Sequence, residues 1–199
     1  MLQDYRTIRD GLERGDYTMQ GNWERIGPLL VNNGGGEILI GDVQFQGPLR
    51  LQVGKGARIE IGDYTSINYD VEIHSKVRVV IGGYCLIGWK TSITDTDYHG
   101  VGYNPPKDMP TTVEEGAWVG CHCIILKGVT VGRGSVVSSA SVVNKDVPPF
   151  TIVGGNPAKV LKEIEPFEGK HGQIYEYKWW DPSFVPKPKP EFVRTGIRA

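Results

Sequence analysis

One histidine lies in a short segment of acidic, hydroxyl-bearing and glycine residues, TDTDYHG at positions 94–100. A neutral imidazole is the side chain best suited to accept a proton near pH 7. His99 is therefore a candidate general base. A carboxylate beside an imidazole can orient it and stabilise its charged form, so Asp95 and Asp97 are candidates for that role. The alternative for both aspartates is that they only form turns.

The adjoining residues Cys121, His122 and Cys123 raise the question of a zinc site. Zinc takes four ligands, usually from C-x₂₋₄-C pairs, whereas alternate residues of a strand point in opposite directions. The histidines at 74, 99 and 122 are separated by 25 and 23 residues, which puts them on different turns of a repeating structure. We therefore expect no metal.

The elements that must position these residues belong to a repeat. Aliphatic residues recur every six positions at Ile61, Ile67 and Ile73, at Ile81, Ile87 and Ile93, and at Val113, Val119, Ile125, Val131, Val137 and Val143. Six is three times the strand period of two, so each repeated residue points to the same side. A strand that turns every six residues returns over itself after three corners, and glycine, Asn or Asp supplies positive φ at those corners. The pattern predicts a mainly β fold, a parallel β-helix of triangular cross-section whose coils bury one another.

Breaks in the period divide the chain. The spacing from Ile93 to Val113 is three units plus two residues, so residues 95–112 are expected to leave the coil as a long loop, where function tends to lie. We expect an N-terminal arm at 1–35 with a short helix, the β-helix at 36–150, a terminal helical segment at 151–165 and a C-terminal arm at 166–199. The arm contains Trp179-Trp180 and a Pro/Lys run at 186–190 that favours extended chain.

Composition limits the classes of function. The 199 residues include 22 Lys plus Arg and 23 Asp plus Glu, a net charge of −1 that argues against nucleic-acid binding by bulk charge. No apolar run approaches the ~20 residues of a membrane span. The N-terminus is not typical of a signal peptide, and three cysteines fit a reducing compartment. We expect a cytoplasmic protein.

Several motifs together resemble the left-handed β-helix hexapeptide acyltransferases. They are the six-residue repeat, the loop at 94–100, Trp118-Val119-Gly120, the run VNKDVP at 143–148 and GGNPAK at 154–159. Within this family the chain is most similar to the sugar O-acetyltransferases, such as the galactoside, maltose and exopolysaccharide enzymes. The resemblance covers residues 36–165 and implies a homotrimer with active sites between subunits, acetyl-CoA as cosubstrate and a sugar or polysaccharide precursor as acceptor.

The same resemblance implies roles for individual residues. His99 matches the catalytic histidine of the family, and Asn68 matches an acceptor-contacting asparagine. Trp89 could stack on a sugar or pack between subunits. The positions that face CoA in the galactoside enzyme fall on Cys121, Ser139, Asn144, Lys145, Lys159 and Lys162. Lysine keeps the charge of the arginines common at the last two positions but loses their bidentate geometry.

Three other functions stay open at this point. The acceptor could be an amine of an aminosugar or an antibiotic. The chain could be a non-catalytic β-helical scaffold. It could also resemble a zinc γ-carbonic anhydrase, although the pair of histidines five residues apart that such enzymes use is missing.

Overall fold

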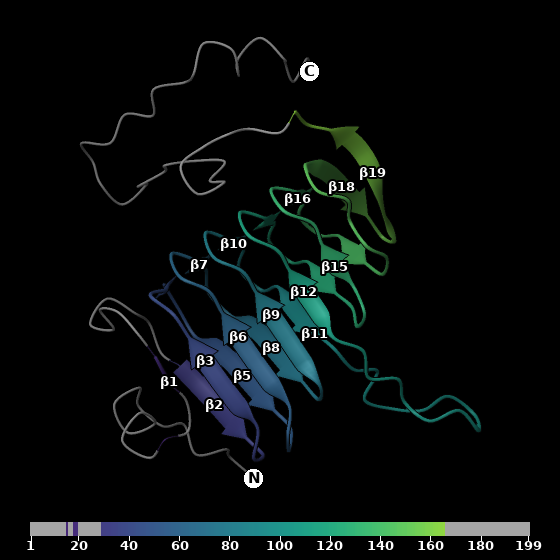
Figure 1. Ribbon diagram of the computed structural model, residues 1–199. Coiled ribbons are helices and arrows are strands. Elements are labelled where there is room, and N and C mark those ends of the chain that lie inside the picture. Colours follow the sequence, from purple (N-terminus) through teal and green to yellow (C-terminus); the bar gives the residue numbers. More distant parts are fainter. Residues whose placement is uncertain (1–14, 16–17, 20–28, 166–199) are drawn as a thin grey trace.

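The computed structural model describes residues 15, 18–19 and 29–165, which form a parallel β-solenoid of about six turns (Figure 1). Three sheets make its faces. Sheet A contains β1 (Thr18–Met19), β3 (Glu37–Ile40), β6 (Arg58–Ile61), β9 (Arg78–Ile81), β12 (Thr111–Val113) and β15 (Thr130–Val131). Sheet B contains β2 (Leu29–Asn33), β5 (Leu49–Val53), β8 (Val71–Ser75), β11 (Ser92–Thr94), β14 (Ile124–Ile125) and β17 (Val142–Val143). Sheet C contains β4 (Gln44–Phe45), β7 (Ser66–Ile67), β10 (Leu86–Ile87), β13 (Trp118–Val119), β16 (Val136–Val137), β18 (Thr151–Gly155) and β19 (Ala158–Glu163).

The interior is a column of aliphatic side chains in register. Ile61 pairs with Ile81, Ile81 with Val113, and Val113 with Val131 on sheet A. Every residue of the predicted six-residue repeat is 0–3% exposed. The prediction of a left-handed parallel β-helix with these residues in its core is confirmed.

The glycines that follow the repeat have a different role from the one predicted. Gly88, Gly120 and Gly132 do not have positive φ, which instead occurs two residues further on, at Lys90, His122 and Gly134. A Cβ on Gly88 would lie 2.5 Å from the Cys121 nitrogen of the next coil, and one on Gly120 would lie 2.6 Å from the Ser139 nitrogen. Glycine is required here because stacked coils approach too closely for a side chain.

The long loop leaves the solenoid where predicted and returns two residues earlier. Strand β11 ends at Thr94 and β12 begins at Thr111, so the excursion loop is 95–110. It is folded as an irregular hairpin with bridges between Thr96 and Asp108 and, at its tip, between Val101 and Asn104. The loop projects away from the stack of coils (Figure 1). At its base the Thr111 hydroxyl donates to the Thr94 carbonyl oxygen at 2.9 Å.

The solenoid extends beyond both predicted boundaries. Residues 29–33 are not part of an arm, because β2 pairs with β5 along its whole length and Leu29 is buried. The helix predicted within 151–165 is wrong: β18 and β19 form an antiparallel hairpin at the end of sheet C. Most of β19 is exposed, so a helix there would have no apolar surface to pack on, whereas pairing with β18 satisfies the backbone.

The helix predicted at 2–14 and the C-terminal arm lie outside the described residues. Within the described ranges, no helix has the length and apolar character needed to cross a bilayer.

Candidate functional site

Four of the predicted site residues lie along one edge of the solenoid, where the chain passes from sheet C to sheet B. We call this the C–B edge. Trp89, Cys121 and Ser139 follow β10, β13 and β16 at equivalent positions, and Asn68 follows β7 one position earlier in its coil. The Cys121 N–H donates to the Ser139 hydroxyl oxygen at 3.2 Å. Trp89 and Ser139 are exposed and Asn68 is half-buried, so these residues form an accessible row.

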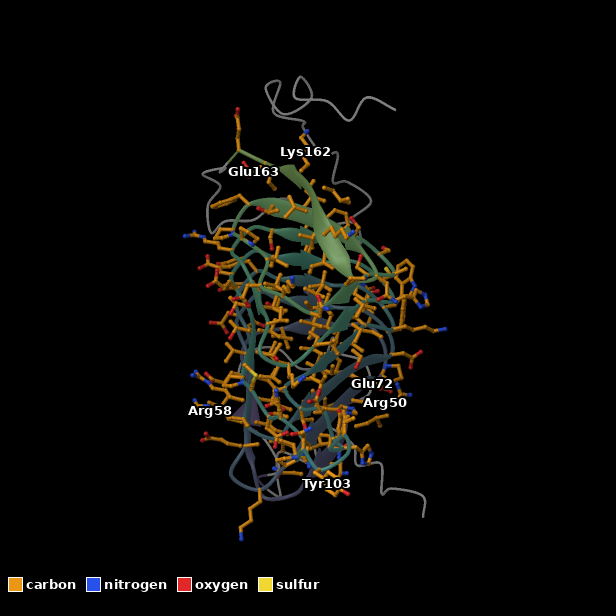
Figure 2. All side chains as sticks on the ribbon, turned by 90° about the vertical axis from the view of Figure 1, so that its right-hand side faces the viewer. Arg50, Arg58, Glu72, Tyr103, Lys162 and Glu163 are labelled. Carbon is orange, nitrogen blue, oxygen red and sulfur yellow. The ribbon has the colours of Figure 1, made fainter. Side chains whose placement is uncertain are left out.

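A second group lies along the edge where the chain passes from sheet B to sheet A, the B–A edge. His99 is in the excursion loop that leaves this edge after β11, and Asn144 and Lys145 follow β17. All three are exposed. Lys159 and Lys162 are on β19 at the end of the solenoid, where Figure 2 shows the Lys162 side chain extending away from the coils.

The two rows are too far apart to act together within one chain. Trp89 and Asp95 flank β11 and are six residues apart, and a strand rises about 3.3 Å per residue, so sheet B separates the edges by up to ~20 Å. Reacting groups must come within about 3–3.5 Å of each other. A site that uses both rows therefore requires the B–A edge of one chain to face the C–B edge of another.

Asp95 does not have the predicted role. It is fully buried at the base of the loop, and its carboxylate is used by the preceding corner. It accepts hydrogen bonds from the Ser75 hydroxyl at 2.8 Å and from the backbone N–H groups of Lys76, Val77 and Arg78 at 2.7, 2.8 and 2.6 Å. Asp95 therefore fixes the loop to the solenoid and is neither a substrate ligand nor the partner of the imidazole.

Asp97 is exposed and pairs with a cation. Its Oδ1 lies 2.5 Å from the Lys127 Nζ, and the hydrogen bond to this lysine holds the pKa of the Asp97 carboxyl below its usual value. The His99 backbone N–H donates to the Asp97 carbonyl oxygen at 2.7 Å, which forms a tight turn. Asp97 thus shapes the turn that presents His99, while its carboxylate is occupied by Lys127.

The sequence prediction missed a contact between the loop and the solenoid. The Tyr98 hydroxyl bonds to His74 Nδ1, the two rings meet edge to face at 5.7 Å, and the Thr94 hydroxyl donates to the Tyr98 oxygen at 3.4 Å. Burial raises the pKa of Tyr98 above 10, so the phenol stays protonated and donates to Nδ1. The neutral His74 ring then carries its proton on Nε2. The signal in the sequence that could have placed His74 beside the loop is the 20–22-residue spacing between successive coils.

Burial lowers the pKa of His74 below 6.5, and the nearby charge of Glu72 opposes this shift only in part. The folded protein therefore binds this proton less readily than the unfolded chain, and the stability that His74 contributes is present above pH 6.5 and lost as the pH falls through its folded pKa. We expect His74→Gln to show a smaller loss of free energy of unfolding between pH 7.5 and 5 than the wild type, measured by urea denaturation. His122→Gln, at an exposed histidine, is the control. An unchanged pH slope in His74→Gln would contradict this assignment.

The three histidines are not assembled into a metal site. His74 and His99 lie at the B–A edge, and His122 lies at the C–B edge. Over residues 15, 18–19 and 29–165, no group of three His, Cys, Asp or Glu side chains is placed to hold a metal ion.

Comparison with known proteins finds acetyltransferases. The chain is 33% identical over 128 residues to galactoside O-acetyltransferase from Escherichia coli, which covers 62% of each chain. It is 32% identical over 127 residues to chloramphenicol acetyltransferase from Agrobacterium fabrum, which covers 52% of this chain and 59% of that one. The structure of a hexapeptide-repeat acetyltransferase from Vibrio cholerae, complexed with acetyl-CoA, is 36% identical and superimposes with a TM-score of 0.52 over 58% of this chain and 65% of that one.

The chain thus spans about three fifths of the length of these relatives. No protein-family model matches it. The six-residue repeat, the solenoid and these similarities agree, and over about three fifths of its length the chain is similar to hexapeptide-repeat acetyltransferases.

Proposed function

We propose that the protein transfers the acetyl group of acetyl-CoA to a hydroxyl of a sugar or polysaccharide precursor, with His99 as general base. The observation that carries this proposal is the histidine presented on an anchored loop, in a solenoid similar to enzymes of this reaction. The two relatives are named for different acceptors, a galactoside and chloramphenicol, so the acceptor of this chain is argued from the chemistry of its own site.

The reaction needs a base, a positioned donor and a positioned acceptor. His99 takes the proton of the acceptor hydroxyl as its oxygen attacks the thioester carbonyl carbon. The tetrahedral intermediate then collapses, the C–S bond breaks, and the imidazolium returns the proton to the thiolate. The products are an acetyl ester and free CoA.

The active form is a homotrimer with its sites between neighbouring subunits. The support is the division of the predicted residues between two edges that sheet B separates. In this arrangement His99 and Lys145 of one subunit face the Trp89, Cys121 and Ser139 row of the next. The pantetheine arm of acetyl-CoA lies along this row, in which Trp89 and Ser139 are exposed. Lys145, Lys159 and Lys162 are the cations for its phosphates.

Calorimetric titration with acetyl-CoA tests the proposal. We expect micromolar binding by the wild type. Lys145→Ala should weaken binding roughly 10–100-fold, because a hydrogen bond to a charged group contributes about 1.5–3 kcal/mol. Lys55→Ala, an exposed lysine on the same edge near the other end of the solenoid, is the matched control. Absence of binding at millimolar acetyl-CoA would reject the transferase proposal, and a monomer in light scattering would reject the intersubunit site.

A further inference from the structure

A small pocket lies on the B–A edge directly beside the excursion loop. It has a volume of about 150 Å³, and the side chains that matter for its chemistry come from Asn32, Gln52, His74, Lys76 and Tyr98. We call it the amide pocket. Its volume is below the ~300–1,000 Å³ typical of sites for drug-sized ligands, so it suits one ring of a larger ligand.

The register of sheet B builds this pocket. Asn32 on β2 pairs with Gln52 on β5, and Gln52 pairs with His74 on β8, so the three side chains point outward in one line across successive coils. Tyr98 closes the line from the loop side through its bond to His74. His99 follows Tyr98 in the chain, so the proposed base is one residue away from the wall of this pocket.

The lining is suited to hydroxyl groups. Each amide offers both donors and an acceptor, and His74 offers the N–H on Nε2 that its bond to Tyr98 leaves. Such a set can satisfy several hydroxyls of one sugar ring, since each hydroxyl both donates and accepts.

The charge of the pocket discriminates between acceptors. Lys76 is its one ionised lining side chain among the described residues. In the part of the chain that the structure describes, no Asp or Glu lines the pocket. Of the nearby carboxylates, Asp95 is buried with its own donors, and Glu72 lies 3.8 Å from Arg50, to which Figure 2 shows it adjacent. An ammonium group in the pocket would meet the like charge of Lys76 and no lining carboxylate, whereas a neutral or acidic sugar would meet no such repulsion.

We propose that the amide pocket binds a hydroxyl-rich sugar unit of the acceptor, neutral or carrying a carboxylate, and excludes an amino sugar. This inference rests on the proposed acetyl transfer for its role in catalysis. It makes Gln52 and Lys76 determinants of specificity for sugar hydroxyls and for an acidic group, respectively.

Direct binding tests the proposal without relying on catalysis. The probes are the methyl glycosides of glucose, glucuronic acid and glucosamine, and the galactose series with the same three substituents, titrated into the full chain and followed by ligand-observed NMR. We expect the neutral and acidic members of at least one series to bind, and the amine to bind at least 10-fold more weakly. Lys76→Gln should remove any preference for the acid over the neutral glycoside.

Gln52→Leu should weaken sugar binding about 10-fold or more. Gln44→Leu is the matched control, because Gln44 is an exposed glutamine that points outward from sheet C. Asn32→Ala provides a second variant if Gln52→Leu is poorly folded by circular dichroism. Tightest binding of the amine, equal binding by Gln52→Leu and Gln44→Leu, or no binding of any glycoside would overturn the proposal.

The two proposals fail in different ways. Loss of acetyl-CoA binding with sugar binding intact rejects the transferase and leaves the pocket as a sugar site. Acetyl-CoA binding with no effect of Gln52→Leu or Asn32→Ala on the glycosides keeps the transferase and rejects the pocket.

Discussion

His99→Ala is expected to lower the turnover number about 10²–10⁴-fold, the range for loss of a positioned general base. The reason is that no other group then accepts the hydroxyl proton at the thioester. His99 is exposed on a loop and its side chain packs into no core, so the fold and the affinity for acetyl-CoA should be unaffected.

The measurement is steady-state acetyl transfer to an identified acceptor, with calorimetry of acetyl-CoA and light scattering on the same sample. Added imidazole should restore part of the lost turnover in His99→Ala, because it can occupy the space and accept the proton. Full activity of the variant would remove His99 from the mechanism. A fall in activity together with loss of acetyl-CoA binding and no rescue would indicate a structural role instead.

Asp95→Ala is expected to lower the free energy of unfolding by about 3–5 kcal/mol, as for other buried, multiply hydrogen-bonded charges that lose one partner. The change leaves three backbone N–H groups and the Ser75 hydroxyl without their acceptor, at a corner where Asp95 and Ser75 are themselves buried. Asp95→Asn keeps the shape but replaces one acceptor oxygen by a donor, so it should cost less than alanine.

Urea denaturation measures this effect, and Asp97→Ala is a matched control in the same loop. The Asp97–Lys127 pair is partly exposed, and such pairs contribute only about 0–1 kcal/mol. If Asp95→Ala were as stable as the wild type but catalytically inactive, the carboxylate would have a direct role in the reaction after all.

The residues of the core could be predicted from the sequence, because a six-residue period of aliphatic residues fits a β-helix whose coils stack on one another. Residues such as Ile87 and Val119 must face the same side, and each coil is needed to cover the next, so pattern and packing agree. The position of the loop followed from the same period, since the phase is lost after Ile93 and regained at Val113.

The sequence was less informative where backbone contacts between coils decide the structure. Gly88 is required for the close stacking of two coils, but from the sequence this need cannot be distinguished from a need for positive φ at a turn. The segment after Pro157 has helix-forming residues, yet it pairs with β18 because that strand's free edge is available beside it.

The site, like the fold, could be predicted from the sequence only in part. The period placed Cys121 and Ser139 at matching corners, and the structure stacks them. The partner of Asp95 could not be predicted, because it depends on whether the carboxylate turns inward to the corner at 76–78 or outward to the loop. The line of Asn32, Gln52 and His74 was also missed, since the early coils are longer than 18 residues and their outward positions do not follow the simple period.

The way the excursion loop is inserted has a consequence for how such proteins can diversify. The coil closes between Thr94 and Thr111 as though the residues between them were absent, and Ile81 and Val113 remain in register across the interruption. A loop of another length or composition could therefore be exchanged at this corner as a cassette, provided that Asp95 and the closing threonines are kept. The scaffold that stacks the coils and the loop that presents His99 are then separable units for engineering.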